Sequence, residues 1–177
     1  MIRLGREGHE MWYVMQVHTG TETRVCEQCR SRVMETDEDV FILQAEKMKK
    51  LQGQWFLVVG RLFPGYVFVE TDRIEDFLTR LKKTGIAMKV LCTGEEMTPV
   101  YPEEEEHLRM LGGDNHIVKY SEGYMEKEVL TVTSGAMKDY KGIVKKVLRH
   151  RRMVVLEVPL MGRTVEVTVG LGIVKRQ

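Results

Sequence analysis

A single CxxC motif is the first candidate for chemistry in this 177-residue chain. Cys26 and Cys29 have the spacing of a zinc half-site or of a redox-active pair. A structural zinc site also needs a second cysteine pair or two suitably spaced histidines, and the histidines of this chain lack that spacing. Both cysteines lie one turn apart within the amphipathic pattern of a helix. We therefore favour a packing role, and we expect no metal and no cofactor.

Four consecutive glutamates, residues 103–106, are the second candidate, because clustered carboxylates can bind metals or act as acids. They follow Pro102, which suits the first turn of a helix, and carboxylates favour the positive end of the helix dipole. Their spacing points them around the helix, which predicts a solvated helix start. We find no phosphate-binding glycine loop and no nucleophile–base pair, so we expect the protein not to be an enzyme.

Basic side chains concentrate in one predicted turn near the C-terminus. Residues 148–152 read LRHRR, and Lys145 and Lys146 precede them. Arginine forks suit phosphates and guanine edges, and neutralising a phosphate backbone gives sequence-independent affinity. The alternative is an ordinary solvated surface turn. The candidate nucleic-acid-binding residues, which the resemblance described below assigns to RNA, are Lys138, Lys141, Lys145, Lys146, Arg149, His150, Arg151, Arg152 and Arg163.

Charge is distributed unevenly along the chain, although the net charge is only +1. Residues 126–177 contain 11 lysines and arginines against 5 acidic residues, whereas residues 11–125 contain 14 against 19. This split predicts two domains with different partners, and the basic domain is the candidate for nucleic acid. The longest apolar run is too short to span a membrane, and the first ten residues contain no secretory signal. We expect a cytoplasmic, monomeric protein without membrane contact.

Strand and helix patterns alternate along the N-terminal part of the chain. Apolar residues at the spacing of one helix face predict a helix over residues 73–83, and Thr21 is predicted to cap an earlier helix with its hydroxyl group. Residues 47–53 are charged and are predicted to form a hairpin connection or a mobile loop. Strand patterns occupy residues 11–17, 40–43, 55–60, 65–70 and 87–91. The elements predict an α+β fold in which residues 11–112 form an α/β sandwich with an antiparallel-rich sheet.

Residues 113–124 are polar and contain glycines, which predicts a linker. Only strand patterns follow, at residues 129–132, 142–148, 153–158, 164–169 and 173–174. Five short strands in so short a segment predict a small five-stranded β-barrel over residues 125–177.

Several segments resemble the NusG family of transcription factors. Residues 12–17, WYVMQV, followed by Gly20, resemble the opening of the NusG-type N-terminal domain, and residues 62–69, LFPGYVFV, resemble its most characteristic segment. Residues 135–144 resemble the KOW motif, an SH3-like barrel module, and residues 160–163 resemble its later hairpin. The order and spacing of these segments agree over nearly the whole chain.

The resemblance implies that the N-terminal domain binds the clamp helices of RNA polymerase. By position, the polymerase-binding patch comprises Phe63, Pro64, Gly65 and Tyr66, supported by Trp12 and Tyr13. An exposed aromatic pair on a Pro-Gly turn is a low-entropy anchor for a helical partner. The alternative is that Phe63 and Tyr66 pack on their own sheet. The resemblance also places Lys83 and Thr84 in a loop near the non-template DNA strand.

The KOW segment leaves two functions open. Met161 stands where housekeeping NusG proteins have the aromatic residue that meets ribosomal protein S10 or Rho, and methionine can still fill an apolar pocket. The basic turn instead resembles the specialised LoaP-type branch of the family. That branch is linked to antitermination of long operons, and its KOW domain is implicated in binding an RNA hairpin. We therefore expect an antiterminator that binds polymerase and a nascent leader RNA hairpin, with a housekeeping elongation factor as the alternative.

Overall fold

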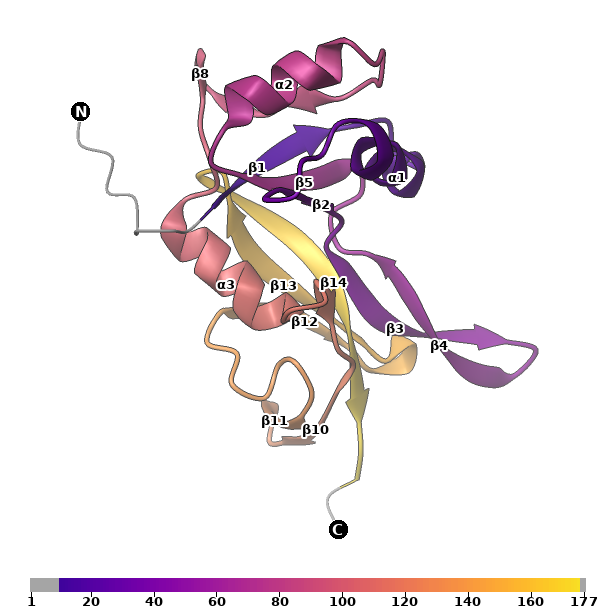
Figure 1. Cartoon of the computed structure of the whole chain (residues 1–177). Coiled ribbons are helices and arrows are strands. Elements are labelled where there is room, and N and C mark those ends of the chain that lie inside the picture. The colour runs from indigo at the N-terminus through magenta and orange to yellow at the C-terminus, as the bar shows by residue number, and fades with distance from the viewer. Residues whose placement is uncertain (1–9, 176–177) are drawn as a thin grey trace. The chain divides into compact units, whose positions relative to one another are not determined.

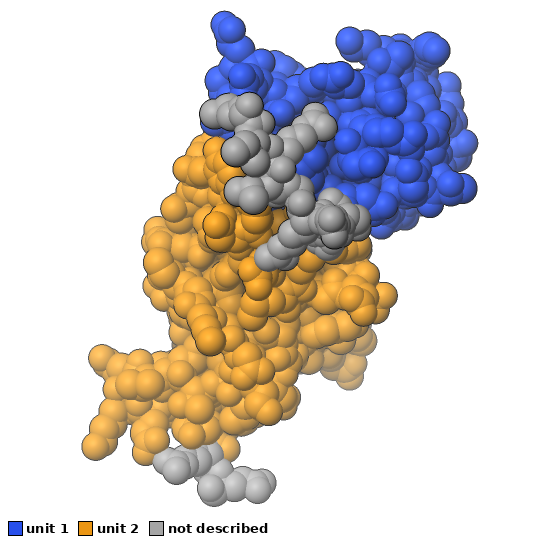
Figure 2. Space-filling model, turned by 60° about the vertical axis from the view of Figure 1, so that its left-hand side comes forward, with its two compact units in different colours: residues 1–42, 64–100 blue, residues 43–63, 101–177 orange. Residues whose placement is uncertain are grey.

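The computed structural model describes residues 10–175 and divides them into two compact units, which Figure 2 distinguishes by colour. Of the described residues, unit 1 comprises 10–42 and 64–100, and unit 2 comprises 43–63 and 101–175. The predicted domains, residues 11–112 and 125–177 with a linker between them, stay predictions. No helix within residues 10–175 is long and apolar enough to cross a membrane.

Unit 1 is built on a four-stranded antiparallel sheet in the order β2-β5-β1-β6. Two helices and a short β-hairpin accompany this sheet (Figure 1). The elements are β1 (Met11–Gln16), α1 (Glu22–Arg32), β2 (Asp39–Phe41), β5 (Tyr66–Thr71), α2 (Ile74–Lys82), β6 (Lys89–Val90), β7 (Cys92–Thr93) and β8 (Glu96–Met97). The predicted sandwich of helices and an antiparallel-rich sheet is confirmed.

Alternation along β1 decides which side chains meet the helices. Tyr13 and Met15 belong to the buried core that also contains Phe77 of α2. Trp12 directly precedes Tyr13 and therefore points to the other side of the strand. There its ring packs edge-on against Phe41, with the ring centroids 4.8 Å apart. The apolar residues of β1 are therefore needed on both faces of the sheet.

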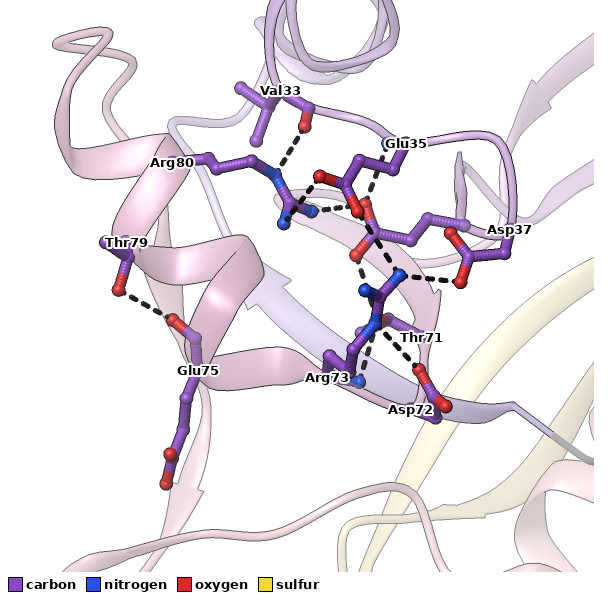
Figure 3. A network of polar contacts seen from close by, with 10 residues as sticks. Val33, Glu35, Asp37, Thr71, Asp72, Arg73, Glu75, Thr79 and Arg80 are labelled. Atoms are coloured by element: carbon purple, nitrogen blue, oxygen red, sulfur yellow. Dashed lines mark hydrogen bonds and ion pairs between the residues drawn. The ribbon is translucent and has the colours of Figure 1, made fainter.

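A network of charged side chains fastens α2 to the segment that follows α1 (Figure 3). The side chain of Glu38 is buried, and its carboxylate accepts hydrogen bonds from the Arg80 guanidinium and, at 3.0 Å, from the Thr71 hydroxyl. Arg73 pairs with Asp37 at 2.6 Å in a more exposed position. The inner pair compensates a carboxylate that has lost its water, whereas the outer pair remains in solvent.

Unit 2 contains a curled five-stranded sheet in the order β11-β10-β14-β13-β12, in agreement with the predicted KOW-type barrel. Its strands are β10 (Ser121–Glu126), β11 (Val129–Ser134), β12 (Ile143–Leu148), β13 (Met153–Leu160) and β14 (Arg163–Ile173). Alternate residues of β13, such as Val154 and Leu156, are buried and form its core.

One predicted barrel strand is wrong. Residues 173–174 form no separate strand, because β14 continues to Ile173. The fifth strand is β10, which begins within the predicted linker. Its sequence, SEGYME, lacks apolar alternation, and its first residue is instead held by a polar contact. The buried Ser121 hydroxyl accepts a hydrogen bond from the Met137 N–H at 3.0 Å.

A long hairpin of β3 (Gln44–Leu51) and β4 (Gln54–Arg61) also belongs to unit 2, and β9 (Ile117–Val118) pairs with β3 in parallel. The strand predicted over residues 55–60 is confirmed, but residues 47–51, predicted as a connection or mobile loop, are part of β3. Gln52 and Gly53 both have positive φ, as the tight type I′ turns of hairpins require. The charged residues of β3 remain in a strand because they pair with the β-branched and aromatic residues of β4.

Helix α3 (Pro102–Gly112) belongs to unit 2 as well. It starts at the predicted proline, but the prediction of a fully solvated start is wrong. Glu104 and Glu105 are buried, whereas the other two glutamates of the run are exposed. The Glu105 carboxylate pairs with Arg109 one turn later at 2.8 Å. Burial is possible because both carboxylates find donors within unit 2.

Candidate nucleic-acid and protein interfaces

The segment expected to meet the polymerase is a turn that leads into β5. Pro64 is exposed, Tyr66 is partly exposed and Phe63 is only 2% exposed. The expected pair of exposed aromatics is therefore wrong for Phe63, whose ring is covered. Trp12 and Tyr13 are also buried, and β1 places them opposite Glu70 and Val69, farther along β5 from the turn.

Glu22, which the sequence reasoning missed, holds this turn in place. Its carboxylate is buried and accepts hydrogen bonds from the Gly65 N–H at 2.7 Å and the Gly20 N–H at 2.8 Å. Gly65 has a φ of +82°, and an added Cβ would lie 3.2 Å from the Thr19 hydroxyl oxygen. The turn is thus fixed by a carboxylate and by a conformation that favours glycine. Only the folded chain brings Glu22 to Gly65, which lies 43 positions later.

The predicted capping role of Thr21 is wrong. The backbone of Thr21 is helical, and its side chain makes no cap hydrogen bond to α1. Its hydroxyl instead donates to the His18 carbonyl oxygen at 2.7 Å. The Glu22 carboxylate, at the first residue of α1, accepts a hydrogen bond from the Gly20 N–H just before the helix.

The basic turn of the barrel forms a short 3-10 helix, Arg149–Arg151, between β12 and β13. Arg149, His150 and Arg151 are all exposed, and none of them has an ion pair among the described residues. Arg152 ends the turn in the left-handed conformation with a φ of 53°. The structure thus gathers three uncompensated basic side chains on a single turn, in the arrangement expected for phosphate contacts.

Arg152 points away from this exposed group toward the β3–β4 hairpin. Its guanidinium carbon lies 4.6 Å from the ring centroid of Trp55 in β4, and the Lys50 ammonium lies 5.9 Å from the same ring. Both distances are within the range of a cation–π interaction. The basic turn is therefore attached to the hairpin through an aromatic ring, a contact that sequence spacing did not suggest.

The other predicted RNA-binding residues do not all join the turn. Lys145 is hydrogen-bonded to Glu166, which raises the pKa of Lys145, and it also pairs with Glu157 at 3.6 Å. Lys146 is exposed. Arg163 pairs with Leu160, at the opposite end of β13 from the basic turn. At about 3.3 Å per residue, that strand separates the two ends by roughly 20 Å.

Lys138 and Lys141 are exposed and precede β12. The start of β12 pairs with Glu157, toward the Arg163 end of β13. The structure therefore does not bring Lys138 or Lys141 to the basic turn, and the most compact basic group is Arg149 to Arg151.

The hairpin between β13 and β14, which was expected to meet S10 or Rho, contacts α3. The buried Glu104 carboxylate accepts the Met161 N–H at 2.8 Å and the Gly162 N–H at 3.0 Å. Met161 itself is 7% exposed. Nearby, the His107 ring of α3 lies edge-on to Tyr140, with the centroids 5.2 Å apart, and burial lowers the pKa of His107. Helix α3 is thus bonded to the backbone of the hairpin that carries the buried Met161 side chain.

Comparison with known proteins decides the family. The family model described as "Transcription termination factor nusG" matches residues 10–109. This chain belongs to the NusG family. "Transcription termination/antitermination protein NusG" of Haemophilus influenzae is 25% identical over 172 residues, covering 93% of both chains. The Bacillus subtilis protein of the same name is 27% identical over 161 residues, covering 86% of this chain and 90% of its own.

The NusG fold is also found by structural comparison. The solved structure "Domain interaction in Thermotoga maritima NusG" matches with a TM-score of 0.53 and 21% sequence identity, covering 91% of this chain and 93% of that one. The two chains therefore share a fold over nearly their whole length.

In this NusG-family chain, the residues predicted near DNA differ in availability. Lys83 is exposed just after α2. The Thr84 hydroxyl donates to the Leu81 carbonyl oxygen at 2.7 Å and accepts the Ile86 N–H at 3.2 Å. Of the two, Lys83 is therefore the side chain that is open to solvent.

The cysteine pair has the predicted packing role. Cys26 and Cys29 are buried on α1, and the Cys26 thiol donates to the Val40 carbonyl oxygen at 3.0 Å. The Cys29 thiol contacts the Met88 sulfur at 3.2 Å, and burial raises the pKa of Cys29 to about 11. A thiol with so high a pKa is a poor nucleophile near neutral pH. Among residues 10–175, no group of three or more histidine, cysteine or acidic side chains could hold a metal.

Proposed function

We propose that this NusG-family protein is a processive antiterminator that binds RNA polymerase through its N-terminal part and a structured nascent RNA through its barrel. The proposal of RNA binding rests on one observation about the basic turn. Arg149, His150 and Arg151 are exposed and have no ion pairs among the described residues. A group of basic side chains without carboxylate partners is suited to a polyanion. The flanking Arg152 is held by Trp55, which limits the freedom of the turn.

The polymerase part of the proposal concerns the turn at Pro64, Gly65 and Tyr66. Its likeness to the family's characteristic segment supports contact with the clamp helices of the polymerase. The Glu22 carboxylate fixes Gly65, so the turn is presented in one conformation and little entropy is lost on binding. Phe63 is proposed to support the turn directly, and Trp12 and Tyr13 are proposed to support it through β5, the strand with which they pair. The exposed Lys83, rather than Thr84, is the proposed contact to the non-template DNA strand.

The burial of Met161 favours RNA over S10 or Rho as the barrel's partner. An S10-like or Rho-like partner would need the Met161 side chain, which is 7% exposed, and the adjoining N–H groups are bonded to Glu104. The basic turn requires no rearrangement before it meets a phosphate. The same turn supports the assignment to the LoaP-type branch, which stays a prediction.

The RNA part can be tested with the full chain and a short RNA stem closed by a tight loop. Arg149→Gln/Arg151→Gln should weaken binding and flatten the dependence of log affinity on log salt by about one per lost phosphate contact. Lys82→Gln/Lys89→Gln is a matched control, since both lysines are exposed in unit 1. Unchanged binding and salt dependence in the arginine variant would show that the turn does not hold RNA. Capture of S10 or Rho without any affinity for the stem would favour the housekeeping function.

A further inference from the structure

The β3–β4 hairpin carries an unusual combination of exposed apolar and basic side chains. Figure 1 shows it as a long two-stranded ribbon whose turn extends away from the barrel strands. Four of its large apolar residues are about half exposed, namely Leu51, Phe56, Leu57 and Val59. A two-stranded ribbon has no second layer to cover both faces. Several exposed apolar side chains in one short element indicate an interaction surface.

The register of the hairpin assigns its residues to two faces. Lys49 lies directly opposite Phe56, and Lys47 lies opposite Val58. Cross-strand partners and alternate residues share a face, so Lys47, Lys49 and Phe56 form one group. Trp55 lies on the other face, opposite Lys50 and in contact with Arg152. One face, which also carries Leu57 and Val59, is thus attached to the basic turn. The Phe56 face is open toward the tip of the hairpin, where Lys49, Leu51 and Phe56 are exposed.

The positive charge of the open face is not compensated within the described residues. No ion pair to Lys47 or Lys49 is found there. Glu46 is the one carboxylate of the hairpin sequence, and it is already bonded to the Lys119 ammonium at 2.9 Å and the Tyr120 N–H at 2.8 Å. Lys47 is also partly buried, which lowers its pKa. A partly desolvated ammonium without a carboxylate is suited to an anionic ligand.

The combination of a free aromatic ring and two lysines fits unpaired nucleic acid. Bases stack on exposed aromatic rings, while basic side chains follow the phosphates. In a paired stem the bases are already stacked, so only loops and single-stranded ends can use such a ring. A protein partner would have to place a carboxylate beside the partly buried Lys47. Charge therefore favours RNA over protein as the occupant.

We propose that the Lys47, Lys49 and Phe56 face of the β3–β4 hairpin binds an unpaired segment of the RNA whose stem is held by the basic turn. Phe56 stacks on a base, and the two lysines contact the flanking phosphates. The two sites adjoin at β4, where Trp55 contacts Arg152 and its neighbour Phe56 faces the opposite side of the ribbon. The inference rests on the proposed RNA-binding function, and it adds a second site that reads unpaired bases.

The test compares two labelled RNAs on the full chain: the short stem with its tight loop, and the same stem with an oligouridine tail. The wild-type protein should bind the tailed RNA more tightly. Phe56→Ala should remove most of that gain, about tenfold, and leave the affinity for the untailed stem unchanged. Lys47→Gln/Lys49→Gln should lower the salt dependence of the tail's contribution by about one. A tail that adds no affinity, or a Phe56 variant that keeps the gain, would overturn the inference.

Matched variants separate a local effect from a loss of folding. Val129→Ala removes another exposed apolar side chain of unit 2, and Lys82→Gln/Lys89→Gln removes two exposed lysines of unit 1. Both controls should keep the gain from the tail. Equal losses in the control and hairpin variants would mean that the hairpin has no particular role, and the inference would fail.

Further experiments distinguish RNA from other ligands of the hairpin and separate this inference from the proposed stem-binding function. If oligouridine alone binds through Phe56 but the untailed stem does not bind, the stem-binding function fails and the hairpin site remains. If an oligothymidine DNA tail adds as much affinity as the RNA tail, the assignment to RNA is wrong. If Phe56→Ala leaves both RNA affinities unchanged and weakens polymerase binding, the hairpin docks a protein and the inference is overturned.

Discussion

The Pro64–Gly65 turn of unit 1 and the basic turn of unit 2 present side chains in opposite ways. Behind the first turn, the buried Glu22 carboxylate accepts hydrogen bonds from two backbone N–H groups, those of Gly20 and Gly65. The basic turn exposes Arg149 to Arg151, and these have no ion pairs among the described residues. Charges in the first region are compensated inside the protein. Charges in the basic turn have no ion-pair partner among the described residues and are available to an external ligand.

This difference separates folding from binding. A charge that is satisfied internally contributes to stability, and its removal leaves a buried group without a partner. An exposed charge on a turn contributes little to stability and is available to an external anion. Mutations of the internally compensated charges of unit 1 should therefore change the free energy of unfolding, whereas mutations of the basic turn should change RNA affinity alone.

The largest effect is expected for Arg80→Leu. This change leaves the buried Glu38 carboxylate without its cation, and it should lower the free energy of unfolding by about 3 kcal/mol. Arg73→Leu is the matched control, because its ion pairs with Asp37 and Glu35 are much more exposed, and it should lower the free energy of unfolding far less than Arg80→Leu does. Urea denaturation of both variants provides the measurement. Equal losses would mean that internal compensation does not stabilise unit 1.

An intermediate effect is expected for Glu22→Ala. The buried Gly65 N–H loses its acceptor, which should cost about 2 kcal/mol in the free energy of unfolding and loosen the turn. Glu27→Ala removes an exposed glutamate from the same helix and should be close to neutral. Denaturation and polymerase binding should be measured together. A Glu22 variant with wild-type stability and wild-type polymerase affinity would contradict the fixed-turn interpretation.

The smallest effect on stability is expected for Arg149→Gln/Arg151→Gln. Both side chains are exposed, so the free energy of unfolding should change by less than about 0.5 kcal/mol. The same variant should lose RNA affinity in proportion to its lost phosphate contacts. Thermal denaturation beside the binding assay tests the comparison directly. A strongly destabilised variant would show that the turn is structural, contrary to its exposure.

The sequence predicts the elements that have a clear local pattern. Apolar spacing correctly placed α2, and strand alternation correctly placed β1 and most of the barrel. It missed β10, whose first residue, Ser121, is bonded to the Met137 N–H, and it misread β3, whose lysines pair with β4. In both cases a tertiary or cross-strand contact overrides a weak local preference. Patterns within a short window do not contain such contacts.

The candidate sites follow the same rule. The run of basic residues in the sequence was enough to locate the basic turn, because the exposure of Arg149, His150 and Arg151 does not depend on a distant partner. The exposure of Phe63 was predicted wrongly, because a loop aromatic can be covered by segments that are distant in sequence. The roles of Glu22, Glu104 and Trp55 depend on partners more than 40 positions away. Their sequence neighbourhoods offer no signal for these contacts.

The bonds from Met161 and Gly162 to Glu104 have a practical consequence for spectroscopy. These two amides belong to a turn of the barrel, but their acceptor lies on α3. Their exchange with deuterated solvent should therefore be slow while the helix is docked and fast once it departs. Other amides of β13 and β14 bond within the sheet and provide an internal reference. The ratio of the Met161 and Gly162 exchange rates to those of the reference amides therefore reports how often α3 leaves the turn. It requires neither a label nor a mutation.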